Sequence, residues 1–492
     1  MTLNGYIAQL VAYAVKYLGL SPRDAVYARN RILDILEQVS YTDEPFDNVP
    51  VLPDSILGGI FACLEQDGRE FDRATLGEKL MDAVMLRPGE HEAIFREKYQ
   101  QGPAQATQWA YDYAIHSDYV KKSAIDKNIK WHADNGLEIT INLSKPEKNN
   151  KDLQKQLDVQ STDYPKCAIC RENEGYERRG FSRRNMRTLS LRLAGEDWFW
   201  QYSPYAYFNE HGIAIAVEHS PMKLDDRTVE RLFDFVEQFP HYFIGNNAPL
   251  PRVGGSILMH DHYQGGKETL PMQKAGIRIS LTSSKYRDIN VGVVNWPGTA
   301  LRLQGSNRKH ISKLAYEIAT AWKTYENADI DILPFTGDVA HNTASCIARK
   351  TNDGYILDMI LRNNRTSERY PDGIFHAHRE YHHIKSESIG LIEAMGLFIL
   401  PARLKRQLAL VKQLMMGQDV EMTDDMQIFA PMIAKLVTKP VSAQQAERIM
   451  KGEIEHICHD ILVNTAVFKR DAAGDKALTE FLQLNGLTIT KR

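Results

Sequence analysis

Residues 254–266 contain the pattern best suited to chemistry, because two glycine pairs enclose His260, His262 and Gln264. If this run is a strand, the three side chains alternate with their neighbours and lie on one face. The flanking glycines have no Cβ, so a large ligand can approach the backbone closely. A face of this kind can bind a metal, attack phosphorus, or do both.

Four roles are open for His262: metal ligand, nucleophile, general base or structural histidine. A neutral imidazole can attack phosphorus near pH 7, because its ordinary pKa of about 6.5 leaves much of it unprotonated. Gln264 can donate an amide N–H to a phosphoryl oxygen but cannot act as a base toward water. The pair therefore favours group transfer over hydrolysis. The string His260-Asp261-His262 also resembles a dinuclear metallohydrolase superficially, but no further hard ligands follow it.

Cys167 and Cys170 form a CxxC pair, which can supply two of the four tetrahedral ligands of Zn²⁺. The chain has no second CxxC, so the missing ligands are expected to be histidines. His219 and His260 are suited to that role, because each comes at or just after the end of an apolar, strand-like run. A chance pair of cysteines or a redox pair is the alternative interpretation.

A second histidine-rich group spans residues 341–383. If His376 and His378 alternate on a strand, they can hold a second metal together with His341. A polar surface cluster explains the same residues equally well.

The surrounding pattern predicts the elements that position these residues. Residues 1–145 have helical apolar spacing, and residues 146–163 have the polar composition of a linker. Short strands are expected at residues 212–217, 256–259, 277–281, 289–294, 344–349 and 355–362, with helices at 228–238 and 311–326. Strands and helices without regular alternation favour an α+β fold, and from residue 388 onward the chain is expected to be mainly helical.

Composition excludes several classes of protein. The 492 residues carry 60 basic and 63 acidic side chains, so no basic field recruits nucleic acid or an anionic membrane. No apolar window is long enough to span a membrane, and no signal peptide is apparent. Five cysteines are too few, and odd in number, for a disulfide framework, so a cytoplasmic location is expected.

Four segments carry a family resemblance: YPKCAICRENEGY from Tyr164, QYSPYAYFNEHGIAIAVEHSPMKL from Gln201, FPHYFIGNNAPLPRVGGSILMHDHYQGG from Phe239 and GIFHAHREYHHIKSESIGLIEAMG from Gly373. They resemble the galactose-1-phosphate uridylyltransferases of the longer bacterial class, within the histidine-triad superfamily. The resemblance implies a duplicated histidine-triad-like core with a mixed or antiparallel sheet. It implies an N-terminal helical domain (1–145), a linker (146–163), a first catalytic half (164–325) and a second half with C-terminal helices (326–492).

The resemblance also implies an activity, in which His262 takes UMP from UDP-glucose and passes it to galactose 1-phosphate. UDP-galactose and hexose 1-phosphates are then the other ligands, without an organic cofactor, and the chain is expected to be a homodimer. A related nucleotidyltransferase or phosphorylase acting on ADP-glucose is the nearest alternative. A zinc-organised binding module without turnover is a more distant one.

Individual roles follow from the same resemblance. Gln264 contacts the phosphoryl group, and zinc is bound by Cys167, Cys170, His219 and His260. Substrate contacts are implied for Asn247, Gly255, Ser256, Lys385 and Glu393. His341, His376 and His378 resemble a second metal site, for which no convincing fourth ligand is present. Asp261 replaces the proline of the shorter class and is a residue that can tune the nucleophile.

Overall fold

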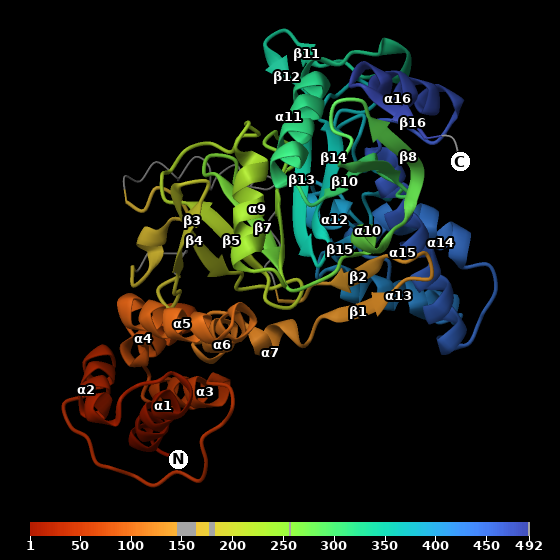
Figure 1. Cartoon of the computed structure of the whole chain (residues 1–492). Coiled ribbons are helices and arrows are strands. Elements are labelled where there is room, and N and C mark those ends of the chain that lie inside the picture. Colours follow the sequence, from red (N-terminus) through yellow and green to blue (C-terminus); the bar gives the residue numbers. More distant parts are fainter. Residues whose placement is uncertain (145–163, 177–182, 255–256, 491–492) are drawn as a thin grey trace. The chain divides into compact units, whose positions relative to one another are not determined.

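The computed structural model describes residues 1–144, 164–176, 183–254 and 257–490. The chain divides into two compact units, whose elements are labelled in Figure 1. The first unit comprises Met1–Lys127 and Lys148–His219, and the second comprises Asn128–Glu147 and Ser220–Arg492. The domain boundaries expected from the sequence stay a prediction, and the expected linker 146–163 lies outside the described residues.

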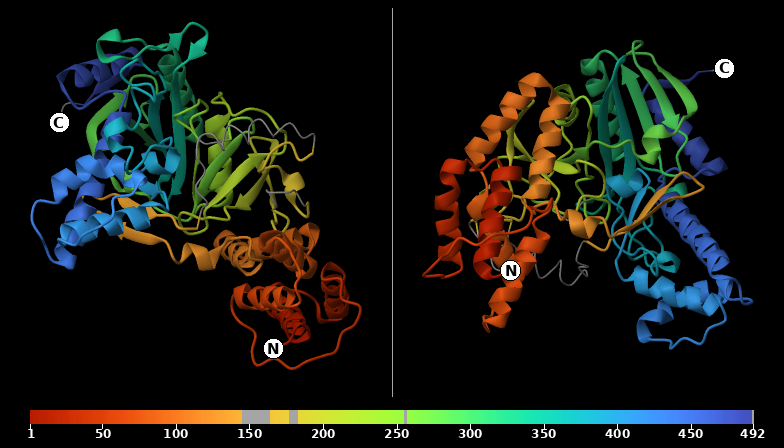
Figure 2. Two further views of the ribbon diagram at one scale, coloured as in Figure 1. Left: turned by 180° about the vertical axis from the view of Figure 1, so that it is seen from behind. Right: turned by 90° about the horizontal axis from the view of Figure 1, so that it is seen from below.

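The first unit begins with helices, as the apolar spacing predicts. These are α1 (Leu3–Tyr17), α2 (Ala25–Ile35), α3 (Asp54–Gln66), α4 (Arg73–Val84), α5 (Pro88–Gln101), α6 (Pro103–His116) and α7 (Lys122–Ile125). Ile7, Leu10 and Ala14 of α1 are buried in a core shared with α2, α3 and α4, and Figure 2 shows these helices from behind and from below. An antiparallel meander completes the unit: β3 (Leu189–Leu193), β4 (Glu196–Tyr202) and β5 (Gly212–Ala216).

The second unit contains most of a large antiparallel sheet. Its strands run in the order β16 (Leu487–Ile489), β8 (Ile277–Ser283), β9 (Asn290–Val294), β10 (Ala300–Gly305), β14 (Gly354–Asn363), β13 (Asn342–Thr351), β6 (Phe243–Asn246) and β7 (His262–Gly266). A smaller sheet contains β1 (Ile129–His132), β2 (Glu138–Ile141) and β15 (Leu397–Leu400), and β11 (Phe335–Thr336) pairs with β12 (Val339–Ala340). The helices are α9 (Thr228–Gln238), α10 (Pro271–Lys274), α11 (Arg308–Thr324), α12 (Leu391–Ala394), α13 (Leu404–Met415), α14 (Ala430–Leu436), α15 (Ala443–Thr465) and α16 (Ala472–Leu484).

The two faces of the large sheet in this unit differ in what covers them. Helices α9 and α11 pack on one face, where Phe233 of α9 lies 4.9 Å from the ring of Tyr355, and Figure 1 shows both helices in front of the strands. Helix α12 packs against the opposite face. A Cβ added to Gly245 would lie 3.0 Å from Cδ2 of Leu391, so glycine lets α12 lie close to the sheet.

The α+β class predicted from the sequence is confirmed, with a large antiparallel sheet and an N-terminal helical region. The predicted helix at 228–238 coincides with α9, and α11 begins three residues before its predicted start. The predicted strand at 256–259 is wrong for the described residues 257–259. The Leu258 carbonyl accepts a hydrogen bond from Met222 N–H, so this run bonds to an irregular segment instead of a strand ladder.

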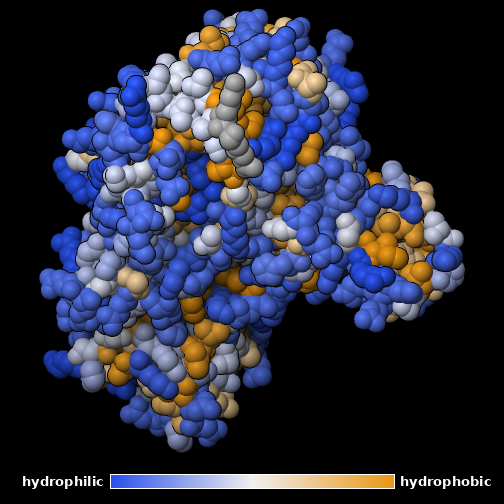
Figure 3. All heavy atoms as spheres, turned by 45° about the vertical axis from the view of Figure 1, so that its right-hand side comes forward, coloured by the Kyte–Doolittle hydropathy of each residue, from blue (hydrophilic) through white to orange (hydrophobic). Residues whose placement is uncertain are grey.

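The face in Figure 3 is mostly hydrophilic, with apolar side chains gathered in patches among the polar ones. Among the helices of the described residues, none has the length and apolar character needed to cross a membrane.

Candidate functional site

His262 begins β7 and is held in one tautomer. Its Nδ1 lies 2.8 Å from the carbonyl oxygen of His260, and a carbonyl can only accept a hydrogen bond. Nδ1 must therefore carry the proton, which leaves the lone pair on Nε2. The side chain is 6% exposed, and burial lowers the pKa of His262 to about 4. The imidazole is consequently neutral near pH 7, with a nucleophilic nitrogen available.

Gln264 lies two residues further along β7, on the same face as His262. It is half-buried and pairs with Gly245 of the neighbouring strand β6. The expected alignment of His260 with these two residues on one strand is wrong, because β7 starts only at His262. His260 instead lies in the bend that precedes the strand and is 1% exposed.

Three of the predicted substrate residues meet at α12. The backbone N–H of Leu391 donates to the side-chain oxygen of Asn247 at 3.4 Å, and Asn247 Nδ2 is buried without a hydrogen-bond partner. Lys385 Nζ lies 2.7 Å from Glu393 Oε1, and both side chains are less than 10% exposed. Gly255 and Ser256, the other two predicted substrate residues, lie outside the described residues.

Cys167, Cys170 and His219 of the first unit form a group that fits a metal ion. Their ligand atoms lie within 4.8 Å of one another. The two Sγ atoms are 3.4 Å apart, too far for a disulfide, and both cysteines are buried. Hydrogen bonding from Cys170 is the main cause of the lowered pKa of Cys167. Asn173 donates to both cysteine carbonyls, at 3.0 and 2.8 Å, and so fixes the turn that carries the thiols.

A buried polar group supports β7 from the other face. Tyr263 lies between His262 and Gln264 and is fully buried. Arg231 Nη1 donates to its hydroxyl oxygen at 3.5 Å. Arg231 in turn donates to Asp225 at 2.8 Å. Asp261 Oδ1 is buried without a hydrogen-bond partner among the described residues, and the expected influence of Asp261 on the imidazole stays a prediction. Burial raises the pKa of Asp261 to about 7, while the charge of Arg231 opposes the shift.

The second histidine-rich group is not brought together as a metal site among the described residues. His341 places Nδ1 2.7 Å from Asn364 Oδ1 and Nε2 2.8 Å from Thr336 Oγ1. His376 and His378 lie in an irregular segment instead of a strand, and each bonds to a backbone carbonyl. Their alternation in sequence therefore does not give them a shared strand face.

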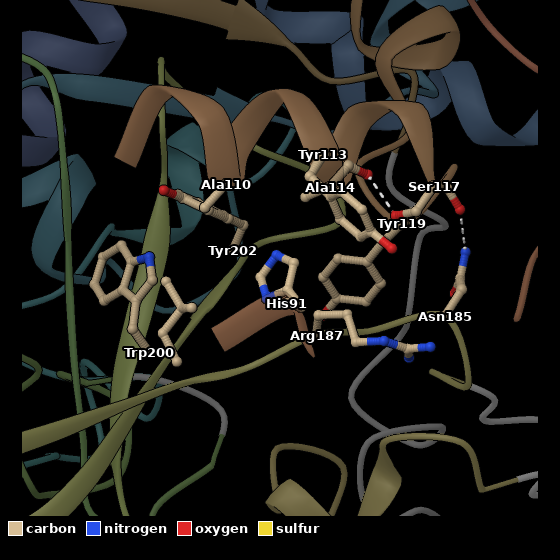
Figure 4. Close-up of a pocket in the computed structure, with 11 residues that line it drawn as sticks. His91, Ala110, Tyr113, Ala114, Ser117, Tyr119, Asn185, Arg187, Trp200 and Tyr202 are labelled. Atoms are coloured by element: carbon tan, nitrogen blue, oxygen red, sulfur yellow. Dashed lines mark hydrogen bonds between the residues drawn. The ribbon is translucent and has the colours of Figure 1, made fainter. Parts of the chain in front are cut away.

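Sequence reasoning missed Arg362, which is buried in β14 on the face covered by α12. Its only signal in the sequence is that it is the one arginine of a mainly apolar strand, in which Asp358 is the other charged residue. His91 is buried, and neither of its ring nitrogens has a hydrogen-bond partner among the described residues. It lines a small cavity in the first unit with Tyr113 and Tyr202 (Figure 4), whose volume of about 10 Å³ suits one water molecule and no substrate.

Comparisons with known proteins identify the family. Residues 20–221 match the N-terminal domain of galactose-1-phosphate uridyl transferase, and residues 230–424 match its C-terminal domain. A galactose-1-phosphate uridylyltransferase of Halalkalibacterium halodurans is 40% identical over 97% of this chain and 97% of its own length. The protein of that name from Clostridium acetobutylicum is 40% identical over 98% of this chain and its whole length. The chain belongs to the galactose-1-phosphate uridyl transferase family.

Among solved structures, the crystal structure of yeast Ap4A phosphorylase Apa2 aligns with a TM-score of 0.29 and 9% identity, covering 65% of this chain and 90% of that one. So low a score supports no inference about the site.

Proposed function

We propose that this chain transfers UMP from UDP-glucose to galactose 1-phosphate through a covalent uridylyl group on His262. Membership of the family makes it a uridylyltransferase, and its relatives match over nearly their whole length. The observation that carries the covalent mechanism is the hydrogen bond from His262 Nδ1 to the His260 carbonyl. It fixes the tautomer in which Nε2 is free to attack.

The reaction consists of two balanced displacements. In the first, His262 Nε2 forms a bond to the α-phosphorus, the bond from that phosphorus to the bridging oxygen breaks, and glucose 1-phosphate leaves. In the second, a phosphate oxygen of galactose 1-phosphate attacks the same phosphorus, the N–P bond breaks, and UDP-galactose leaves with the imidazole restored. Gln264 donates its amide N–H to a non-bridging oxygen in both steps.

The substrate contacts that we propose lie around α12. Lys385 and Glu393 contact the hexose phosphate, and Asn247 contacts the nucleotide together with Gly255 and Ser256. The support for the first three is their burial beside the sheet face that carries His262 and Gln264. Positioning of the two substrates on this face would supply much of the rate enhancement.

Zinc would be held by Cys167, Cys170 and His219, with His260 as the fourth ligand of the group. The backbone supports this assignment, because Asp261 N–H donates to the Ser220 carbonyl at 2.7 Å and the two histidines directly precede these residues. Two thiolates and two imidazoles form a closed tetrahedral set, so the ion would be structural. It would fix the backbone of His260, whose carbonyl orients His262.

We further propose that the protein acts in the cytoplasm as a homodimer. The support is the sparse cysteine content and the resemblance of its motifs to a dimeric family.

Labelling with UDP-glucose that carries ³²P in the α-phosphate tests the mechanism. Wild-type protein should retain an acid-labile, base-stable label, and His262→Ala should retain none. His378→Ala, which removes a histidine from the other His-x-His segment, is the matched control and should label normally. Label from ADP-glucose but not from UDP-glucose would overturn the uridylyl assignment, and undiminished label on His262→Ala would overturn the nucleophile.

A further inference from the structure

Arg362 carries a pair of hydrogen-bond donors that no residue in the described part of the chain uses. The side chain is 1% exposed, and neither Nε nor Nη2 has a hydrogen-bond partner. These two atoms form one edge of the guanidinium, whose parallel N–H groups match two oxygens of a phosphate or a carboxylate. A buried donor without a partner costs free energy, so the open edge calls for an explanation.

The register of the sheet places Arg362 on the face that carries the reactive residues. Gln264 pairs with Gly245, Gly245 pairs with Ile347, and Ile347 pairs with Asp358. Residues that pair directly project to the same face, and so do residues two apart along one strand. Arg362, four residues beyond Asp358, therefore shares a face with His262 and Gln264.

Another unpartnered polar group lies on this side of the sheet. Asn247 Nδ2 is buried without a hydrogen-bond partner among the described residues, and the charge of Glu393 acts on Arg362. Lys385 Nζ lies 2.7 Å from Glu393 Oε1, and the Gly390 N–H donates to Oε2 of the same carboxylate at 3.1 Å. The carboxylate is thus held by other groups, and the edge of Arg362 remains open.

Arg302 lies on the same face but has hydrogen-bond partners within the protein. It donates to Asp358 at 2.6 Å and to the carbonyls of Ala275 and Met272 at 2.9 and 3.0 Å. Arg302 therefore clamps α10, with its charge compensated. Arg362 lies on the neighbouring strand with two donors unused, and the contrast indicates that its partner arrives with a ligand.

We propose that Arg362 binds two oxygens of a substrate phosphoryl group, and this inference rests on the proposed function. The phosphate of the hexose 1-phosphate and the phosphate of the nucleotide have the same chemistry. Lys385 and Glu393, for which we propose contacts to the hexose phosphate, lie on this same side of the sheet, which makes the hexose 1-phosphate the expected source. Arg362 would then be a substrate-binding residue in β14, the strand that pairs with β13.

Calorimetric titration with glucose 1-phosphate and, separately, with UMP tests the assignment. Arg362→Gln should raise the Kd of glucose 1-phosphate by at least about 100-fold, the loss expected for two charge-assisted hydrogen bonds, and change the Kd of UMP by less than about threefold. Arg362→Lys keeps the charge without the paired donors and should raise the same Kd by about 10-fold. A larger effect on UMP would assign the edge to the nucleotide phosphate instead.

Arg302→Lys is the matched control, since it replaces a partly buried arginine on the same face with lysine. It should lower the midpoint of thermal unfolding while leaving both Kd values within about threefold. Should Arg362→Gln fail to fold, Arg362→Lys carries the test. Unchanged Kd values in a folded Arg362 variant, or an equal loss in Arg302→Lys, would overturn the inference. If the wild-type protein forms the uridylyl label, failure of the Arg362 inference leaves the proposed function standing. If the wild-type protein forms no label and binds neither ligand, the inference and the proposed function both fail.

Discussion

Two segments of this chain share the pattern Gly-apolar-His-x-His but place their histidines in different surroundings. In 260–264, His262 begins a strand, and its Nδ1 donates to the backbone carbonyl of His260. In 376–378, both histidines lie in an irregular segment and bond to carbonyls, and His378 also stacks on Tyr370. His-x-His spacing alone therefore does not decide the chemistry of the two histidines. The role of each ring follows from which of its nitrogens remains available.

The backbone explains why the second segment is not a strand. Gly373 has a φ of +135°, which residues with a Cβ rarely adopt, and a Cβ there would lie 2.8 Å from Cβ of His376. The N–H of Ile374 bonds to the Arg365 carbonyl, and a short 3-10 helix begins at Arg379. This local turn geometry replaces the ladder that would have aligned His376 with His378.

The largest expected difference between the two segments is in turnover. His262→Ala should lower kcat/KM for uridylyl exchange by at least about 10⁴-fold, because it removes the atom that forms the covalent bond. His378→Ala should change kcat/KM by less than about threefold. Initial rates with UDP-glucose and galactose 1-phosphate measure both. Similar losses in the two variants would remove the functional distinction between the segments.

The next difference is in metal binding. Cys167→Ser should remove the bound zinc, which is expected at about one ion per chain in the wild type, and lower the midpoint of thermal unfolding. His341→Ala should leave the zinc content unchanged, because both ring nitrogens of His341 already have hydrogen-bond partners. Elemental analysis of the purified proteins measures the ion. Zinc that persists in Cys167→Ser, or falls in His341→Ala, would reverse the assignment of the two groups.

Acid should destabilise the second segment through His376. Burial lowers the pKa of His376 to about 4, so the folded state holds this ring neutral while the unfolded chain takes up a proton below about 6.5. The free energy of unfolding should therefore fall as the pH drops from about 6.5 to 4, by at most about 3 kcal/mol from this residue. His376→Asn should show a shallower fall in denaturant titrations across that range. An unchanged slope would mean that His376 is already protonated in the folded protein.

The sequence predicted the parts of this molecule that depend on periodicity and on residue type. Helix α9 and the grouping of Cys167 with Cys170 and His219 follow from apolar spacing and from the preference of zinc for thiolates. The start of β7 did not follow, because the preceding apolar run bonds to residues 220–222, which are distant in sequence. Arg362 was missed for a similar reason. Its open donor edge is a property of tertiary packing, and no local pattern records it.

The smallest expected effect concerns the stacked pair in the second segment. The rings of Tyr370 and His378 lie 4.2 Å apart at an interplanar angle of 19°. Such a pair contributes about 0.5–1.5 kcal/mol beyond simple burial, so Tyr370→Leu and His378→Leu should show a coupling of that size in a double-mutant cycle of unfolding free energies. Activity should stay close to that of the wild type in all three variants. A coupling near zero would show that hydrogen bonding alone holds His378, and a large loss of activity would place this segment in the reaction after all.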